Sequence, residues 1–308
     1  MLATRLSPHL KKLTKTCPAI YRQFVPSGKE EKDETITMVD PLLEDHFTVT
    51  RGLVHKYTNR ALVLLTMNCA AYCRFCTRRR KVSDINKGII TEKDLDNMVK
   101  YVKKHPEIKE LVFSGGDPLT VPVILKKALE KFSRLPQIKI LRVGSRLPVS
   151  NPAAVNKKVI DALKVVKNQP LYLMLHFEHP AEITPVTEAA LKRFRPYCTG
   201  MFSQSVSLKG VNYSVQVLYD LFSRLVEVGV KPYYLYRCDP VKGAEHFIVD
   251  FKKEVKNFTE LRKKLSGLAT PMYFIDAPDG AGKIPVPLDF WHFDKTKYRD
   301  FNGKLLKI

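Results

Sequence analysis

Three cysteines lie within eight residues, in the segment Cys69-Ala-Ala-Tyr-Cys73-Arg-Phe-Cys76. A structural zinc site needs four ligands, usually as two spaced pairs, and a ferredoxin cluster needs a fourth local cysteine. Here the spacing is C-x3-C-x2-C, and the remaining cysteines stand apart at Cys17, Cys198 and Cys238. Three thiolates on one tight loop can hold three corners of a 4Fe–4S cube and leave its fourth iron open for a ligand. The alternative, three incidental thiols, is disfavoured by so specific a spacing.

The cysteines directly follow the first of six short apolar runs that alternate with amphipathic stretches. We expect buried strands at Ala61–Thr66, Leu111–Ser114, Ile138–Val143, Leu171–His176, Met201–Ser207 and Pro232–Arg237. We expect helices at Glu92–Lys104 (capped by Thr91), Pro122–Ser133, Ala154–Val166, Pro185–Phe194 and Val215–Val228. A further helix at Lys252–Leu268 precedes a seventh strand-like run, Met272–Ile275. This alternation predicts an α/β fold with a parallel sheet, here a partial (β/α)6 barrel that keeps its chemistry at the carboxyl ends of the strands.

The start of the chain is basic and carries no acidic residue before Glu30. That composition resembles a weak transit peptide, but the stretch from Pro18 to Pro26 is typical of an ordered segment, so we expect it to pack on the barrel. We therefore expect a short helical N-terminal lead-in over residues 1–45, the barrel over residues 46–295 and a C-terminal tail over residues 296–308.

Composition limits the class of protein. The 308 residues are 44% hydrophobic, which is typical of a globular protein with a sizeable core, and no apolar run is long enough to predict a membrane span. The formal net charge is +21, from 52 Lys and Arg against 31 Asp and Glu. These cations are spread along the whole chain without a nucleic-acid-binding motif, so we expect no nucleic-acid partner, while anionic ligands or an acidic protein partner stay open. The clustered cysteines and the lack of a secretory signal favour a reduced compartment, the cytoplasm.

The cysteine segment after the first strand resembles that of the radical S-adenosylmethionine (radical SAM) superfamily. A second segment, Phe113-Ser-Gly-Gly-Asp-Pro-Leu119, ends the second strand and resembles the glycine-rich segment of that superfamily. The resemblance implies a radical SAM partial barrel, in which Cys69, Cys73 and Cys76 hold a 4Fe–4S cluster and the open iron chelates S-adenosylmethionine. Electron transfer from the cluster then releases a 5′-deoxyadenosyl radical. The residues implied for the S-adenosylmethionine site are Ser114, Gly115, Gly116, Asp117, Ser145, His176 and Gln204; for His176, a core histidine is an equal alternative.

Further segments resemble lysine 2,3-aminomutase and its relatives, in a short form. They are Leu53–Arg60, Cys69–Arg80, Gly144–Arg146, His176–Pro180, Gln204–Val206, Tyr233–Asp239 and Asp276–Lys283, and they occur in the order of that family. This resemblance implies that Lys283 forms a Schiff base with pyridoxal 5′-phosphate and that Lys56 and Arg60 bind the cofactor's phosphate. The family usually has arginine where this chain has Lys56. A P-loop fails at Lys283, because Ala277 and Ile284 stand where that motif needs Gly and Ser or Thr.

The same resemblance implies a substrate site for a basic amino acid. Arg78 matches the arginine that binds the α-carboxylate, and Asp239 and Asp276 match two carboxylates that bind the distal ammonium of lysine. Two acids suit a cation and would repel an acidic substrate, although either alone would more commonly be a cap or turn residue. The implied enzyme is an isomerase, a radical aminomutase that converts L-lysine to β-lysine by 1,2-amino migration.

Several alternatives stay open from the sequence. An aminomutase of the elongation factor P lysine-modification pathway, or one for another basic amino acid such as arginine, would share these residues; an RNA-modifying radical enzyme or an iron–sulfur electron carrier fits less well. We expect the electron donor to be an acidic flavodoxin or ferredoxin that docks on the basic surface. Long members of the family carry a tail with zinc-binding cysteines. Ser214 stands where a partner zinc cysteine would be expected, so we expect no structural zinc, and any homo-oligomer would form without that tail.

Overall fold

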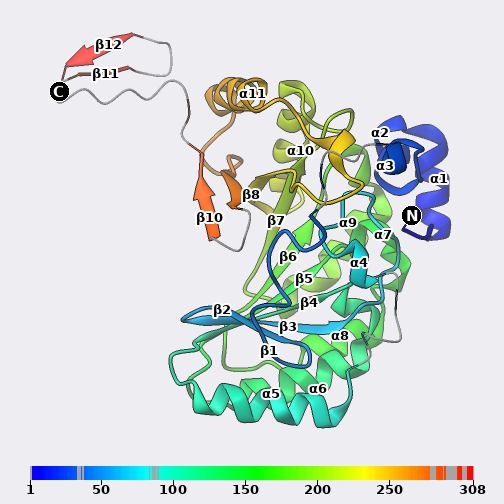
Figure 1. The fold of residues 1–308 in the computed structure, drawn as a ribbon, viewed down its shortest axis with the longest axis vertical. Coiled ribbons are helices and arrows are strands. Elements are labelled where there is room, and N and C mark those ends of the chain that lie inside the picture. Colours follow the sequence, from blue (N-terminus) through cyan, green and yellow to red (C-terminus); the bar gives the residue numbers. More distant parts are fainter. Residues whose placement is uncertain are drawn as a thin grey trace.

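A ten-stranded sheet, in which the strands follow one another in sequence order from β1 to β10, is the centre of the molecule (Figure 1). The computed structural model describes residues 2–32, 36, 38–82, 84, 88, 90–277, 282–286, 288, 297–299 and 304–307. Seven consecutive strands are parallel: β3 (Arg60–Thr66), β4 (Glu110–Gly115), β5 (Ile140–Ser145), β6 (Leu171–His176), β7 (Gly200–Ser207), β8 (Lys231–Arg237) and β9 (Met272–Ala277). The predicted partial (β/α)6 barrel with a seventh strand is therefore confirmed.

Antiparallel strands extend both edges of this parallel sheet, and the sequence analysis missed them. At one edge, β1 (Thr48–Thr50) and β2 (Leu53–Tyr57) precede β3. They are short and carry mixed polar and apolar residues, so their period-2 pattern is weak. At the other edge, β10 (Gly282–Pro285) pairs with β9 and sets Lys283 directly opposite Asp276. Residues 278–281 of the predicted glycine-rich loop lie outside the described residues.

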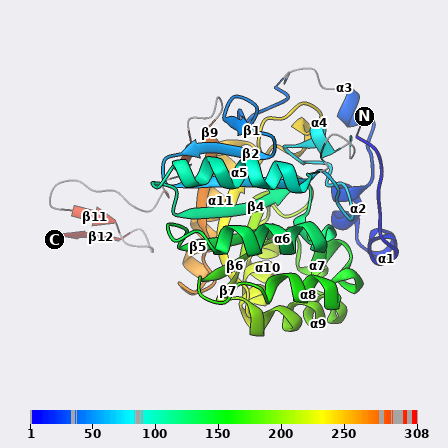
Figure 2. The same ribbon diagram turned by 90° about the horizontal axis from the view of Figure 1, so that it is seen from below.

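The helices that follow the strands cover one face of the sheet, as Figure 2 shows. Their bounds are α5 (Glu92–Lys104), α6 (Pro122–Ser133), α8 (Lys157–Leu163), α9 (Pro185–Phe194), α10 (Val215–Glu227) and α11 (Phe251–Lys264). Thr91 and Asp94 form a capping box at the start of α5, which confirms Thr91 as its cap. The expected start of α8 at Ala154 was wrong, because the side chain of Asn156 accepts hydrogen bonds from the backbone N–H groups of Lys158 and Val159 and begins the helix there.

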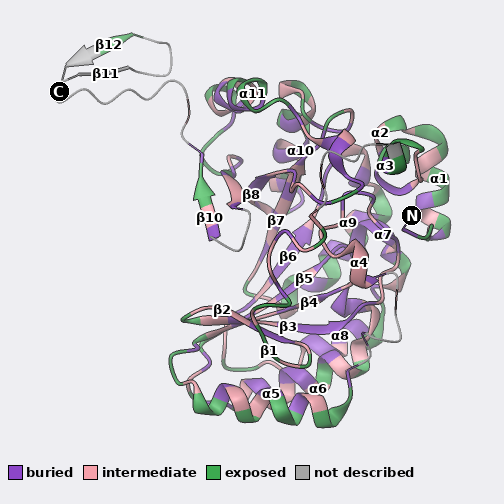
Figure 3. Cartoon of the chain, in the orientation of Figure 1, coloured by how far each residue is buried: buried purple, intermediate pink, exposed green. Residues whose placement is uncertain are grey.

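Alternation along the strands separates the hydrophobic core from a polar interior. In β4, Leu111 and Phe113 are fully buried under the helices, whereas Val112 and Ser114 face the inside of the barrel and line a cavity. Because successive side chains of a strand point to opposite faces, the same strands supply both the core and the site. Figure 3 shows the buried strands inside and the exposed residues on the outer sides of the helices.

The basic start of the chain packs on the barrel, as expected. It forms α1 (Pro8–Thr16), α2 (Pro18–Phe24) and α3 (Lys29–Lys32), which lie on the same side of the molecule as α4 (Arg79–Val82) and α7 (Leu147–Ser150) (Figures 1 and 2). Leu10, Ile20 and Phe24 are fully buried in a cluster with Ala71 of the cysteine segment. Burial of this kind is worth roughly 2 kcal/mol for each large side chain.

Two short strands lie in the predicted tail, β11 (Lys297–Arg299) and β12 (Leu305–Lys307), and they pair antiparallel. Within the described ranges, no helix is both long enough and apolar enough to cross a membrane.

Candidate active site

The inner side of the sheet and the loops at its carboxyl end enclose a cavity of about 400 Å³. Every residue to which the sequence analysis gave a site role lines this one cavity, from Lys56 on β2 to Lys283 on β10. Residues that lie more than two hundred positions apart in the sequence are thus brought together by the curvature of the sheet. Their shared position supports a common site, while the role of each stays a prediction.

The three cysteines of the opening motif are free thiols on the loop after β3. Burial raises the pKa of all three thiols, that of Cys76 to about 11; for Cys69 the charges of Asp117 and of the other two cysteines add to the effect. Thiols in such surroundings stay protonated until a metal displaces the proton. No group of three or more His, Cys, Asp or Glu side chains in the described part of the chain converges on a single metal position. Three free thiols on one loop beside the cavity suit a cube that needs one thiolate at each of three corners.

The glycine-rich segment after β4 packs directly on the loop that carries the cysteines. A Cβ atom at Gly115 would lie 2.1 Å from the carbonyl oxygen of Thr66, and one at Gly116 would lie 2.4 Å from that of Asn68. Gly115 also has φ +121°, which side chains rarely adopt. Two glycines are therefore required by the close approach of the ends of β3 and β4.

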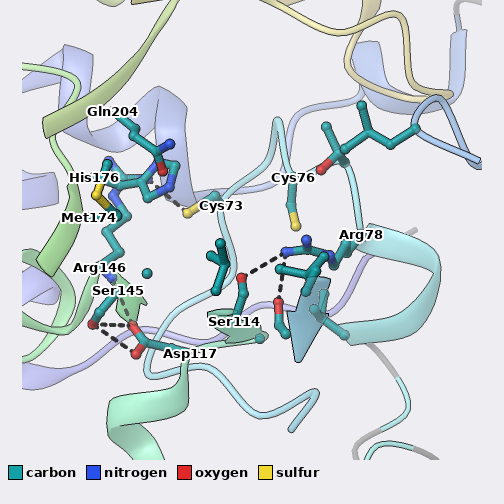
Figure 4. Close-up of a pocket in the computed structure, with 18 of the residues that line it drawn as sticks. Cys73, Cys76, Arg78, Ser114, Asp117, Ser145, Arg146, Met174, His176 and Gln204 are labelled. Carbon is teal, nitrogen blue, oxygen red and sulfur yellow. Dashed lines mark hydrogen bonds between the residues drawn. The ribbon is translucent and has the colours of Figure 1, made fainter. Parts of the chain in front are cut away.

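Asp117 and Ser145 join the loops after β4 and β5. The Ser145 hydroxyl donates to the Asp117 carboxylate at 2.8 and 3.0 Å, and the backbone N–H of Arg146 donates to it at 2.8 Å (Figure 4). Burial raises the pKa of Asp117 to about 6 despite these hydrogen bonds. The pair is a fixed polar wall of the cavity, and its predicted contact with S-adenosylmethionine is untested.

His176 ends β6 and pairs in register with Gln204, which lies inside β7; the two side chains are side by side in Figure 4. Burial, followed by the charges of Arg146 and Arg78, lowers the pKa of His176 to about 4. The imidazole is therefore neutral at pH 7 and can donate a hydrogen bond from one nitrogen while accepting at the other. Its position on the cavity wall favours the ligand-site interpretation over the core histidine.

Arg78 has an ion-pair partner that the sequence did not indicate. Its guanidinium donates to Glu44 at 2.7 and 2.9 Å, and its Nη1 donates to the Ser114 hydroxyl and the Gly115 carbonyl, both at 3.2 Å. Glu44 is 4% exposed and lies in a turn without a recognisable motif. Burial raises the pKa of Glu44, but Arg78 outweighs it and the net pKa is lowered. A substrate carboxylate at Arg78 would have to share the guanidinium with Glu44.

The two arginines after Arg78 serve the surrounding structure. Arg79 pairs with Glu30 of α3 at 2.7 Å, and Arg80 pairs with Asp40 and Asp45 at 2.7 and 2.6 Å. These contacts fasten the lead-in to the cysteine segment.

An acidic pair and Lys283 line another part of the cavity: Asp239 follows β8, Asp276 lies on β9 and Lys283 on β10. The Lys283 ammonium donates to both oxygens of Asp276, at 2.7 and 2.8 Å, and lies 4.6 Å from the ring centre of Tyr236. Asp239 has no such cation partner in the described part of the chain. Burial and then the charge of Asp276 raise the pKa of Asp239 to about 7, although Lys283 acts in the opposite direction. The wall therefore holds one paired carboxylate and one that is half-protonated near neutral pH.

Lys56 and Arg60 form a cationic corner beside this wall. Both lie against the ring of Tyr57, at 5.5 and 4.2 Å from its centre. Burial lowers the pKa of Lys56, and Asp276 partly restores it. Two cations near Lys283 suit a ligand that carries a phosphate at one end and reaches that lysine with its other end.

Comparisons with known proteins agree with this geometry. Residues 63–232 match the model of the radical SAM superfamily, so the chain belongs to that superfamily. Its fold is similar to that of a radical SAM methyltransferase from Sphaerobacter thermophilus, with a TM-score of 0.51 and 14% identity over 73% of this chain and 68% of the other.

Within the superfamily, the chain belongs to the lysine 2,3-aminomutase family. It is 36% identical to L-lysine 2,3-aminomutase of Methanococcus maripaludis over 92% of its own length and 66% of the relative's. It is also 31% identical to glutamate 2,3-aminomutase of Clostridioides difficile, over 95% and 69% of the two chains. The chain thus spans about two thirds of the length of these curated relatives.

Membership of this family implies a 4Fe–4S cluster, S-adenosylmethionine and pyridoxal 5′-phosphate, and the residues present fit all three. Free thiols at Cys69, Cys73 and Cys76 surround one cavity. The same cavity holds a lysine, Lys283, near the cationic corner that would take a phosphate.

Proposed function

We propose that the protein is a radical aminomutase, an isomerase that converts L-lysine to β-lysine. The amino group moves from Cα to Cβ, and one hydrogen moves from Cβ to Cα, so the atoms balance. The observation that carries the proposal is the pair of carboxylates, Asp239 and Asp276, on the wall of the cavity that also holds the three cysteines and Lys283. Relatives named L-lysine 2,3-aminomutase support it.

When bound, the cluster and S-adenosylmethionine supply a carbon radical that removes hydrogen, and pyridoxal phosphate binds the migrating nitrogen. Lys283 would hold the carbonyl carbon of pyridoxal phosphate, with Lys56 and Arg60 at its phosphate. Arg78 would orient the substrate's α-carboxylate through the N–H groups that now bond Ser114 and Gly115.

The acidic pair would bind the distal ammonium of lysine. Asp276 is at present neutralised by Lys283. If Lys283 holds pyridoxal phosphate, its nitrogen would no longer bond both oxygens of Asp276, and a substrate ammonium could then pair with Asp276 and Asp239. Desolvation inside the cavity strengthens this pairing and keeps water away from a reactive radical.

A glutamate substrate is the competing interpretation, because one relative is a glutamate 2,3-aminomutase. Its distal carboxylate would stand beside Asp239 and Asp276, and like charges in a buried site cost several kcal/mol. The acidic pair therefore favours lysine, or another basic amino acid such as arginine.

The test is an anaerobic reconstitution with iron, sulfide, pyridoxal phosphate, S-adenosylmethionine and reductant. L-lysine, L-arginine and L-glutamate are supplied separately, and the products are identified by mass spectrometry after derivatisation. We expect the 2,3-isomer of lysine. Full loading of cluster and pyridoxal phosphate without β-lysine would refute the proposal, and turnover of glutamate alone would reassign the substrate.

We further propose that an acidic flavodoxin or ferredoxin in the cytoplasm supplies the electron, and that it docks on α1 and α2. These helices pack on the cysteine segment, and residues 2–29 contain no Asp or Glu. The exposed cations of residues 2–29 are Arg5, Lys11, Lys12, Lys15, Arg22 and Lys29. Reduction by such a donor, followed by stopped flow, should slow as salt is added and in K11E/K12E/K15E. K126E/K157E, on α6 and α8, is the control; a rate that does not change with salt would end this proposal.

A further inference from the structure

Arg146 connects the cysteine segment to the lead-in, and no cofactor or substrate role has been given to it. It follows β5 and is 8% exposed. Its Nη1 donates to the sulfur of Cys73 at 2.8 Å (Figure 4), while its Nη2 donates to Glu182 at 2.9 Å and to the side chain of Gln23. One guanidinium thus contacts a cluster cysteine, a buried carboxylate and helix α2 together.

The guanidinium is held in place from every side. Its carbon lies 4.6 Å from the ring centre of Phe24 and 5.4 Å from that of Phe75, and the backbone N–H of Arg146 donates to Asp117. Its Nε is buried and finds no acceptor among the described residues. A side chain this constrained cannot turn away when a negative charge forms at the Cys73 sulfur.

The local charges make Arg146 a permanent cation. Burial opposes its charge, but Cys73, Glu182 and Glu178 outweigh that effect and raise the pKa of Arg146. Glu178 is 0% exposed, and burial raises its pKa well above the usual range. Glu182 is the acidic side chain that accepts a hydrogen bond from the guanidinium, and the Cys73 sulfur and the Gln23 side chain are its other acceptors.

We propose that Arg146 is a positioning residue that tunes the cluster: its hydrogen bond and charge at the Cys73 sulfur stabilise the reduced cluster and raise its reduction potential. Reduction adds one electron to the cluster, so the reduced form carries more negative charge on its sulfurs and gains more from a nearby cation and donor. Hydrogen bonds to the sulfurs are among the factors that set such potentials. This inference rests on the cluster of the proposed function and is independent of which amino acid is the substrate.

The experiment measures the midpoint potential of the reconstituted cluster by redox titration with electron paramagnetic resonance. R146M removes both the positive charge and the hydrogen-bond donors. R146K keeps the charge but cannot donate to Cys73 and Glu182 together, as the guanidinium does. E182Q removes the negative charge beside Arg146. The matched control is R74M: Arg74 is adjacent to Cys73 in sequence and fully buried, but its guanidinium bonds Glu30 and the carbonyls of Leu2 and Ala3, not a cluster sulfur.

We expect a shift to more negative potential in R146M, a smaller negative shift in R146K, and a positive shift in E182Q. At the midpoint of the wild type, the R146M cluster should be less than half reduced. A purely structural role would move R146M and R74M together, or would move R146M and E182Q in the same direction, and either result overturns the inference. If R146M does not assemble a cluster, the opposite signs of R146K and E182Q decide. A wild-type protein without any cluster would instead refute the proposed function.

Discussion

Replacing Asp239 by asparagine should stabilise the protein without its ligands, by an amount that grows with pH. Burial and the charge of Asp276 raise the pKa of Asp239 from 3.8 to about 7. Between these two values the folded chain binds more protons at Asp239 than the unfolded chain does, so the free energy of unfolding falls as pH rises through that range. Asparagine cannot ionise, so the free energy of unfolding of Asp239→Asn should not fall with pH for this reason.

The magnitude follows from the size of the shift. One pKa unit corresponds to ~1.4 kcal/mol, so the full shift from 3.8 to about 7 costs the wild type ~4 kcal/mol well above pH 7. At about pH 5 only part of the cost has developed, ~2 kcal/mol. Solvent screening of this partly exposed side chain makes both figures upper values.

Urea unfolding of the ligand-free protein at about pH 5 and about pH 8.5 measures the difference. Asp276→Asn is the control: its carboxylate is already paired with Lys283, so its loss should destabilise the fold. Because burial is the larger cause of the raised pKa of Asp239 and Asp276 the smaller, the gain that grows with pH should be smaller than in Asp239→Asn. An Asp239→Asn variant that is equally stabilised at both pH values, or destabilised at the higher one, would refute the reasoning.

Lys283→Ala should abolish the visible absorbance of bound pyridoxal phosphate while the iron content stays that of the wild type; loss of both would contradict separate sites in one cavity. Cys76→Ala should do the converse, with loss of the cluster's brown absorbance and retention of pyridoxal phosphate, as checked by iron assay and spectrum. Gly116→Ala should destabilise the fold by ~2 kcal/mol, because the new Cβ would meet backbone atoms at 2.4 and 2.7 Å; unchanged urea unfolding would show that the loops can move apart. Glu44→Ala should cost ~3 kcal/mol, since it leaves the half-buried Arg78 charge without its carboxylate, and Glu44→Asp, which keeps the charge, should cost less in the same assay.

Much of the fold was predictable because the barrel is built from local patterns. The bounds of α5, α6 and α9 follow directly from helical periodicity between a cap or proline and the next apolar run. The edge strands β2 and β10 were not predictable from the sequence, because they are short and depend on pairing with β3 and β9 rather than on a hydrophobic pattern of their own.

The site divides in the same way. The spacing of the cysteines and the paired glycines could be identified from the sequence, because few other kinds of site require these motifs. Glu44 carries no local signal, and its pairing with Arg78 arises only when the turn before β1 folds over the loop after β3. The bond between Arg146 and Cys73 likewise spans 73 positions and depends on the neighbouring ends of separate strands.

The order of the contacts along the chain has a consequence for biosynthesis. All contacts described around the cysteines, from Gln23 to Glu182, are complete before β7 is made. Lys283 comes much later, on the last strand to join the large sheet. A nascent chain therefore contains the cysteines and their hydrogen-bonding partners before it contains Lys283, while the later residues that line the cavity and pack on Cys73 and Phe75 still have to be added.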